Sequence, residues 1–234
     1  MYWTRWFPSR DDATAMPRSK LLTLAEGAAL VPRGARVMVG GFGLVGKPVA
    51  LVEQLLEHPE ATGLTVISNN VGEPGKGLGR LLAEGRIARA IGSYFTSNRD
   101  AVRAHAEGRL EVELLPQGTM AEAIRAGGAG IAAFFVPTAA GTLLADGHET
   151  RSFDGVEHVL QHALRADVAL LRAHRADALG NLVYDKTARN FNPDMATAAD
   201  LVIAQVDELV PAGAIDPEAV VTPHLLVDHL VLTP

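Results

Sequence analysis

The sequence predicts an α/β protein: an open, mostly parallel sheet with helices on both faces, plus a C-terminal portion that contains a β-hairpin. Two observations predict the sheet. Apolar, β-branched runs at residues 36–39 and 64–67 have the composition of buried strands. Each is followed by a glycine or polar turn and then by a helical pattern, and this unit recurs along the first half of the chain. A helix that returns the chain to the same edge makes successive strands parallel.

The elements of the first half follow from this repetition. They are, in order, a helix at residues 24–31, a strand at 36–39, a helix from 48 to 57, a strand at 64–67, a glycine-rich loop at 72–79, a helix at 80–84, a strand at 87–94, a helix at 99–107, a strand at 110–114 and a helix from 119 to about 126. Thr23 with Glu26, and Thr119 with Glu122, have the spacing of capping boxes that begin the first and last of these helices.

The pattern changes after residue 142. The Asp146-Gly147 pair predicts the turn of a β-hairpin at residues 143–151. Buried strands are expected at residues 168–171 and 201–204, and a last strand at 225–232. Between them, residues 181–193 are polar with little period, so we expect this stretch to be a loop fixed by function or by contacts.

Composition limits the function. The chain has 234 residues, of which 48% are hydrophobic and 21% charged, as in an ordinary globular protein with one large core. A net charge of −6 argues against a nucleic-acid surface, and the absence of cysteine excludes disulfides and thiolate nucleophiles. No apolar run approaches the ~18 residues of a membrane span. We expect a cytoplasmic protein that binds neither nucleic acid nor membrane.

Residues 1–18 stand apart as an N-terminal extension, and residues 19–234 form the main domain. The extension holds both tryptophans and has no hydrophobic period. Either it is a genuine arm or the protein begins at Met16.

Three binding motifs compete for the strand–glycine–helix stretch at residues 36–48. Gly41, Gly43 and Gly46 fit the G-x-G-x-x-G dinucleotide fingerprint, but no acidic residue for a ribose follows about 20 positions on. The same glycines and the next lysine fit a P-loop up to the position that needs a hydroxyl for Mg²⁺, where Pro48 has none. The third motif is Gly-Gly-Phe-(three residues)-Gly-(one residue)-Pro. Packing alone also explains such a turn.

Further motifs accompany the loop. They are Ser68-Asn69-Asn70, Gly77-Leu78-Gly79, Pro116-Gln117-Gly118, the run from Arg125 to Ile131, Gly180-Asn181-Leu182 and the run from Lys186 to Pro193. With the loop, they make residues 20–232 resemble the A (α) subunits of family I coenzyme A transferases, most of all the succinyl-CoA:3-ketoacid type. The resemblance implies covalent, ping-pong catalysis. In that mechanism a glutamate of the B (β) subunit attacks an acyl-CoA, and the glutamate side chain becomes a CoA thioester. The thioester then passes the CoA to a 3-oxo acid of the acetoacetate type.

This chain contains no Ser-Glu-Asn-Gly segment that would carry that glutamate. The resemblance therefore implies half an active site, completed by a B subunit in an α2β2 assembly. Coenzyme A is a substrate, with no permanently bound cofactor and no metal. The residues implied around the glutamate are Asn69, Asn70 and Gln117, and those implied at the CoA and thioester entrance are Gly40, Gly41, Phe42, Gly43, Leu44, Val45 and Gly46. Amide groups suit this role because they donate hydrogen bonds without titrating; turn chemistry also explains the two asparagines.

The sequence departs from the family at Arg33, Val49, the Phe95-Thr96-Ser97 run and His224, which leaves acyl specificity open. The alternatives are a 3-oxoadipate or acetate CoA transferase, a non-catalytic acyl-CoA-binding module, and a nucleotide-binding dehydrogenase half.

Other candidate residues carry weaker signals. His158 and His162 could bind a metal if they lay on a helix, but no third ligand has matching spacing, so a solvated or half-buried pair is favoured. Glu111 and Glu113 alternate on a strand and are expected to face solvent. Lys186 and Arg189 suit CoA phosphates, a partner protein or a local structural role.

Overall fold

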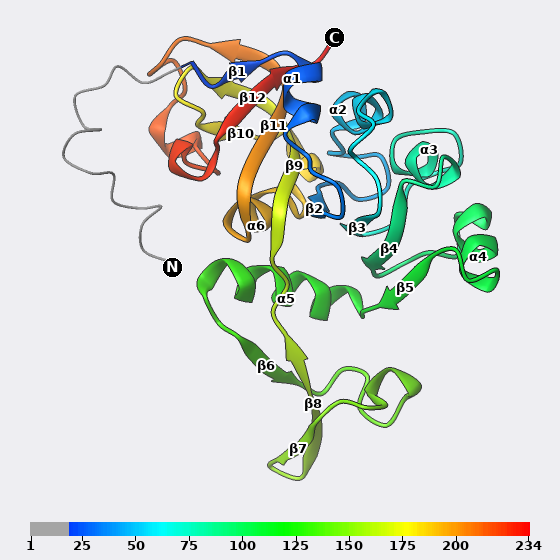
Figure 1. The fold of residues 1–234 in the computed structure, drawn as a ribbon. Helices are drawn as coiled ribbons and strands as arrows, with labels where there is room; N and C mark the ends of the chain where they lie inside the picture. The colour runs from blue at the N-terminus through cyan, green and yellow to red at the C-terminus, as the bar shows by residue number, and fades with distance from the viewer. Residues whose placement is uncertain (1–18) are drawn as a thin grey trace.

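The computed structural model describes residues 19–234, and the proposed extension at residues 1–18 lies outside the described part. Figure 1 shows a large twisted sheet flanked by helices, with a small antiparallel sheet extending beyond helix α5. The predicted fold class is confirmed.

The main sheet has nine strands within residues 19–234, in the order β1-β12-β11-β9-β2-β3-β4-β5, with β10 paired to β9. All its pairs are parallel except β10 with β9. The strands are β1 (Leu21–Leu22), β2 (Arg36–Val39), β3 (Leu64–Ile67), β4 (Ile87–Gly92), β5 (Glu111–Leu114), β9 (Ala166–Asp177), β10 (Leu182–Val183), β11 (Ala199–Val210) and β12 (His229–Leu232).

Helices cover both faces of this sheet. The α-helices are α1 (Leu24–Ala29), α2 (Val49–Gln54), α3 (Leu78–Ala83), α4 (Arg99–Ala106), α5 (Gln117–Ala129) and α6 (Asn192–Thr197). The 3₁₀ helices are η2 (Leu55–Glu57), η3 (Leu143–Ala145), η4 (Lys186–Arg189), η5 (Pro217–Ala219) and η6 (His224–Leu226).

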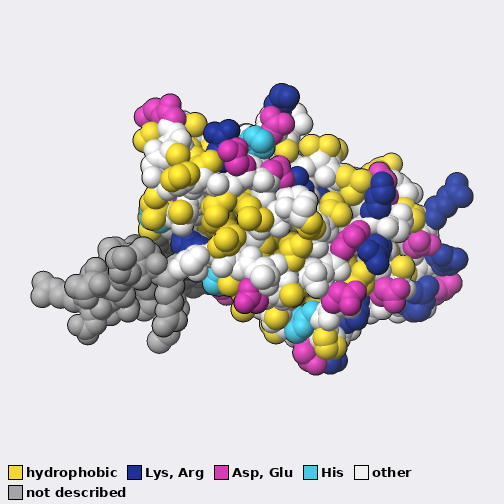
Figure 2. Space-filling model, turned by 90° about the horizontal axis from the view of Figure 1, so that it is seen from above, with side chains coloured by type: hydrophobic (Ala, Val, Ile, Leu, Met, Phe, Trp, Pro, Cys, Tyr) yellow, Lys and Arg dark blue, Asp and Glu magenta, His cyan; other side chains and the backbone are white. Residues whose placement is uncertain are grey.

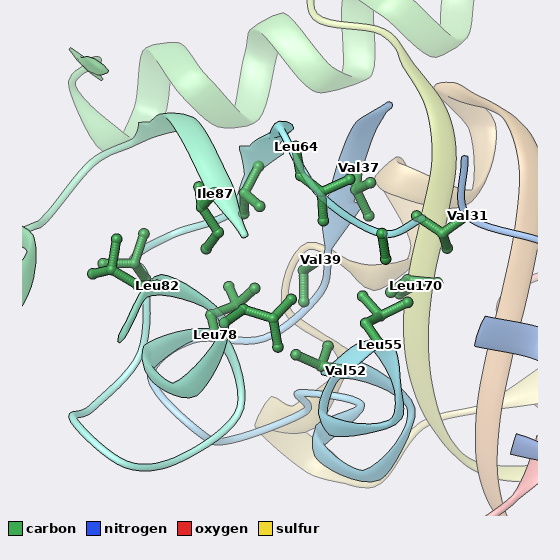
Figure 3. Packing of buried hydrophobic residues seen from close by; sticks show 14 of the residues in the cluster. Val31, Val37, Val39, Val52, Leu55, Leu64, Leu78, Leu82, Ile87 and Leu170 are labelled. Carbon is green, nitrogen blue, oxygen red and sulfur yellow. The ribbon is translucent and has the colours of Figure 1, made fainter. Parts of the chain in front are cut away.

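Each face has its own hydrophobic core. One core joins β2, β3 and β4 to helices α2 and α3 through buried side chains such as Val39, Leu55 and Leu78 (Figure 3). The other joins the opposite face to α5 and α6, with Met38, Met120 and Met195 fully buried. Because successive side chains of a strand point to opposite faces, Met38 and Val39 enter different cores.

The hairpin lies later in the chain than predicted. Strands β6 (Ala133–Val136), β7 (Thr150–Phe153) and β8 (Val156–His162) form the small antiparallel sheet. Its turn is Asp154-Gly155, where both residues have positive φ (52° and 78°), as a two-residue hairpin turn requires. The predicted turn fails because Asp146 has φ −60°, and the residues before it form η3 rather than a strand.

Other boundaries also differ. Helix α5 begins at Gln117, so Thr119 is buried in its first turn and the second capping box is wrong; the first, at Thr23 and Glu26, is confirmed. The polar stretch 181–193 contains β10, η4 and the start of α6. Strands β9 and β11 have 12 residues each, much longer than predicted, and the last strand begins only at His229.

Acidic and basic side chains are interspersed on the face seen in Figure 2. Some ion pairs join neighbouring strands of the main sheet: Arg89 on β4 contacts both Glu111 (3.3 Å) and Glu113 (2.6 Å) on β5. The glutamate pair therefore belongs to an ion-pair network on the sheet edge. No helix within residues 19–234 is long and apolar enough to cross a membrane.

Candidate active site

The carboxyl ends of four adjacent strands meet at one edge of the sheet. Strands β2, β3, β4 and β5 are neighbours and run parallel, so the residues that follow them lie side by side. These are Gly40 after β2, Asn69 after β3, Ser93 after β4, and Gln117, which begins α5 after β5. In open parallel sheets this edge is where ligands bind.

Asn69, Ser93 and Gln117 form a hydrogen-bonded polar cluster. Asn69 Nδ2 donates to Ser93 Oγ at 2.9 Å and to Gln117 Oε1 at 3.2 Å. Ser93 Oγ also lies 3.5 Å from Gln117 Oε1. Asn69 is only 2% exposed, whereas the Gln117 residue is exposed. Asn69 is thus a buried support for a side chain that reaches the surface.

The fixed carbonyl of Gln117 determines where its NH₂ group lies. Oε1 is held by Asn69, and within residues 19–234 Nε2 has no acceptor. The two ends of a planar amide point in different directions, so Nε2 faces away from the Asn69 amide. The cluster therefore presents a free, uncharged double donor at the sheet edge.

Asn70 does not join this cluster. Its Oδ1 accepts a hydrogen bond from Gly72 N at 2.9 Å, which is the turn chemistry of an asparagine after a strand. Among the described residues no hydrogen bond links Asn70 to Asn69 or Gln117. Asn70 therefore shapes the loop that leads to α3.

The glycine loop is a tight turn after β2. Phe42 and Val45 exchange two backbone hydrogen bonds (2.9 and 3.1 Å), and both side chains are about half exposed. A Cβ atom at Gly46 would lie 2.2 Å from Ala188 O, and the φ of Gly46 is +70°. By contrast, Gly43 (φ +60°) faces open space. Glycine is thus required for packing at Gly46 and only for backbone conformation at Gly43.

Two asparagines that precede or begin α6 hold the loop in place. Asn190 Oδ1 accepts from Gly41 N at 3.0 Å, and its Nδ2 donates to Val45 O at 3.0 Å. The fully buried Asn192 donates to Gly46 O at 3.1 Å. The polar stretch at residues 181–193 is therefore fixed by contacts, as expected.

Three backbone donors of the loop remain free. Within residues 19–234, the N–H groups of Gly43, Leu44 and Gly46 have no acceptor, whereas those of Gly41, Phe42 and Val45 do. Free backbone N–H groups held on a rigid loop can stabilise an anionic or oxyanionic group. The loop and the Gln117 amide thus supply uncharged donors from neighbouring strand ends.

Lys47, the residue after the loop, is buried. It is 2% exposed, and its Nζ has no hydrogen-bond partner among the described residues. Burial alone lowers the pKa of its ammonium group to about 8. In the sequence Lys47 is notable only as part of a P-loop match. Its burial could not be predicted, because lysine is almost never buried.

Sequence reasoning also missed Ser93, Asn190 and Asn192 as parts of this region. Ser93 could have been found as the polar residue after the strand next to Asn69. The histidine pair gives no site: His158 and His162 lie on strand β8, not on a helix. No group of three or more metal-ligating side chains occurs in residues 19–234. Lys186 and Arg189 are exposed on η4.

A family model described as "Coenzyme A transferase" matches residues 21–233, almost the whole described chain. The chain belongs to the coenzyme A transferase family. The A subunit of the succinyl-CoA:3-ketoacid coenzyme A transferase of Xanthomonas campestris pv. campestris (strain B100) is 54% identical over 205 residues, covering 88% of this chain and 84% of that relative. The alpha subunit of the acetate CoA-transferase of Escherichia coli (strain K12) is 43% identical over 216 residues, covering 92% and 98%.

Solved structures of coenzyme A transferases share the fold. The acyl-CoA transferase YdiF of Escherichia coli O157:H7, in a thioester complex with CoA, matches with a TM-score of 0.85 at 22% identity. The match covers 97% of this chain and 49% of YdiF, so this chain spans about half the length of that protein. The sheet edge that carries Asn69 and the glycine loop is therefore part of a coenzyme A transferase fold.

Proposed function

We propose that the chain is the A subunit of a transferase that moves CoA from succinyl-CoA to a 3-oxo acid of the acetoacetate type. The observation that carries the proposal is a set of uncharged donors at the sheet edge: the Gln117 amide and the free N–H groups of the glycine loop. The chain has no cysteine and no Gly-x-Ser-x-Gly segment. Such a site can bind oxygen atoms and stabilise developing charge, and it needs a nucleophile from elsewhere.

The nucleophile in this proposal is a glutamate of a partner B subunit. Its carboxylate attacks the thioester carbonyl of succinyl-CoA, and the CoA thiolate leaves as a mixed anhydride forms. The thiolate then attacks the glutamyl carbonyl and releases succinate, which leaves a glutamyl-CoA thioester. The same steps in reverse, with the 3-oxo acid in place of succinate, transfer CoA to the second acid.

The residues of this chain act on the oxygen atoms in these steps. Gln117, held by Asn69, donates from Nε2 to a carboxylate or carbonyl oxygen near the partner's glutamate. Gly40 to Gly46 line the entrance for CoA and its thioester, and the free N–H groups of Gly43, Leu44 and Gly46 face charge that develops there. Each well-placed donor of this kind contributes about 3 kcal/mol to transition-state stabilisation. Asn70 acts indirectly by shaping the adjoining loop.

The names of the relatives support this substrate class and this division into subunits. Relatives at 54% and 46% identity are named as A subunits of succinyl-CoA:3-ketoacid transferases, the latter as probable. We extend the proposal to a cytoplasmic α2β2 assembly. The second candidate is an acetate CoA transferase, favoured by the alpha-subunit relative, which aligns over 98% of its own length.

The proposal is tested by co-expressing the chain with a B subunit, then following acetoacetyl-CoA formation from succinyl-CoA and acetoacetate. Activity of the complex, and none of either chain alone, is the expected result. Transfer to acetate but not to acetoacetate would select the second candidate. A stable complex that transfers CoA to neither acid would refute both substrate assignments.

A further inference from the structure

Lys47 is the largest fully buried side chain in the described part of the molecule. Three buried side-chain nitrogens there lack a hydrogen-bond partner: Lys47 Nζ, Arg89 Nε and His229 Nδ1. Arg89 still contacts two glutamates, and His229 Nδ1 belongs to an imidazole ring and not to an ammonium group. Of these three side chains, only Lys47 is a buried ammonium group with no ion-pair partner within residues 19–234.

The position does not need a lysine for folding. A buried ammonium group without a partner is more costly than an apolar side chain of the same length. The glycine-loop motif fixes Gly46 and Pro48 but leaves the residue between them unspecified. The lysine is therefore explained better by a ligand than by packing.

The side chain runs from the glycine loop to the Gly72–Gly79 loop. Its backbone and Cβ pack against Gly41, where a Cβ atom would lie 2.9 to 3.0 Å from them. Farther out, Lys47 Cδ is 3.9 Å from the position of a Cβ atom on Gly77. These two loops follow the neighbouring strands β2 and β3, so Lys47 lies between the glycine loop and the loop that leads to α3.

The surrounding charges are already engaged or exposed. Glu53 of α2 accepts from Gly77 N at 2.9 Å and pairs with Arg80 of α3 at 3.0 Å. Glu73 and Lys76 of the Gly72–Gly79 loop are exposed. The lowered pKa of Lys47 has burial as its only cause, which agrees with a cation that no carboxylate of these elements neutralises.

We propose that Lys47 binds the free carboxylate of the dicarboxylic substrate, a role that rests on the proposed transferase function. Succinyl-CoA carries one such carboxylate at the end of a short chain, and succinate keeps it beside the reacting carboxylate, whereas acetate has only the reacting one. A compact ammonium group is suited to a single carboxylate. Because Lys47 is only 2% exposed, this role requires the Gly72–Gly79 loop to move. The movement would break the contacts of the loop with Glu53 and with Asn98, whose Nδ2 donates to Gly72 O at 3.2 Å.

The same ammonium group could instead meet a phosphate of CoA, and the test separates the two anions. Succinate, acetate and CoA are titrated separately by calorimetry into the complex of this chain with its partner. Lys47→Met removes the charge at nearly constant volume. Lys76→Met, at an exposed lysine of the adjoining loop, is the matched control. Lys47→Gln serves if the methionine variant does not fold.

We expect Lys47→Met to weaken succinate binding at least tenfold at pH 7, and to change the affinity for acetate and CoA by less than twofold. Wild-type succinate affinity should fall about tenfold between pH 7 and pH 9, because the protonated fraction of a group with pKa near 8 falls by about that factor. The variant should lose this pH dependence, and Lys76→Met should keep it.

Two results would overturn the proposal. One is unchanged succinate affinity and unchanged pH dependence in Lys47→Met, which would make the lysine a packing residue. The other is an equal loss for CoA and succinate, which would assign the charge to the CoA phosphates. Because binding is measured without turnover, an inactive wild-type complex would refute the proposed function and leave the Lys47 result interpretable.

Discussion

Asn69 Nδ2 donates to Gln117 Oε1 across 3.2 Å and so joins the end of β3 to the first residue of α5, 48 positions later in the chain. The bond fixes the carbonyl side of the Gln117 amide and leaves its NH₂ group free. A buried asparagine thus determines the donor that an exposed glutamine presents.

Gln117→Ala removes that donor and should lower kcat about hundred- to thousandfold, the usual effect of losing one such hydrogen bond. Assembly with the partner should be unchanged, because the side chain is exposed. Steady-state kinetics and size-exclusion chromatography measure the two effects. Gln54→Ala, which shortens a partly exposed glutamine on α2, is the control; wild-type turnover in the Gln117 variant would remove Gln117 from the site.

Asn69 should act through Gln117. Asn69→Ala is expected to lower kcat in the wild-type background and to add less than threefold in the Gln117→Ala background, since residues that act as one unit are not additive. Asn69→Asp should be at least as harmful as Asn69→Ala, because a carboxylate accepts from the Gln117 NH₂ group and turns it inward. Full additivity in this double-mutant cycle would mean that Asn69 has an independent role.

The glycine loop offers a matched pair of substitutions. Gly46→Ala should destabilise the fold by several kcal/mol, because the new Cβ atom would lie 2.2 Å from Ala188 O. Gly43→Phe should cost only about 1–2 kcal/mol for its left-handed backbone, yet block activity by filling the entrance. Thermal unfolding and turnover distinguish the two. Gly43→Asn, which tolerates that backbone, is the control, and normal kinetics in Gly43→Phe would refute the entrance assignment.

Lys47 should make stability depend on pH. Its folded pKa of about 8 lies below the ordinary value of 10.5, so between these values the unfolded chain binds more protons and stability rises with pH. Below pH 8 the full penalty applies, about 3 kcal/mol for a shift of this size. Lys47→Met should therefore raise the free energy of unfolding by up to about that amount at pH 7, and by progressively less toward pH 10.5. Urea unfolding at several pH values measures the difference. A gain that stays constant with pH would show that titration of Lys47 is not its source.

The parallel sheet could be predicted because each buried strand is followed by a turn and a helix within a short span. The position of the site could be predicted for the same reason, since polar residues after adjacent strands share one edge. What holds the glycine loop could not: Asn190 and Asn192 contact it from about 145 residues away. Local patterns carry no information on such pairs.

Two other differences between the sequence-based predictions and the structure have local causes. Asp146-Gly147 and Asp154-Gly155 are the same dipeptide, and only the strand-forming residues around the second make it a hairpin turn. The sequence predicts no role for Lys47, because lysine ordinarily lies on the surface and burial of its unpaired charge cannot be expected from the pattern. Such an exception is typical of a ligand site.

The half-site claim is tested most directly by intact mass spectrometry of the complex after incubation with succinyl-CoA alone. We predict that the partner subunit gains the mass of CoA less one water and that this chain stays unmodified. A CoA adduct on this chain would contradict the account, because it would place the nucleophile among residues that we assign only to binding and charge stabilisation.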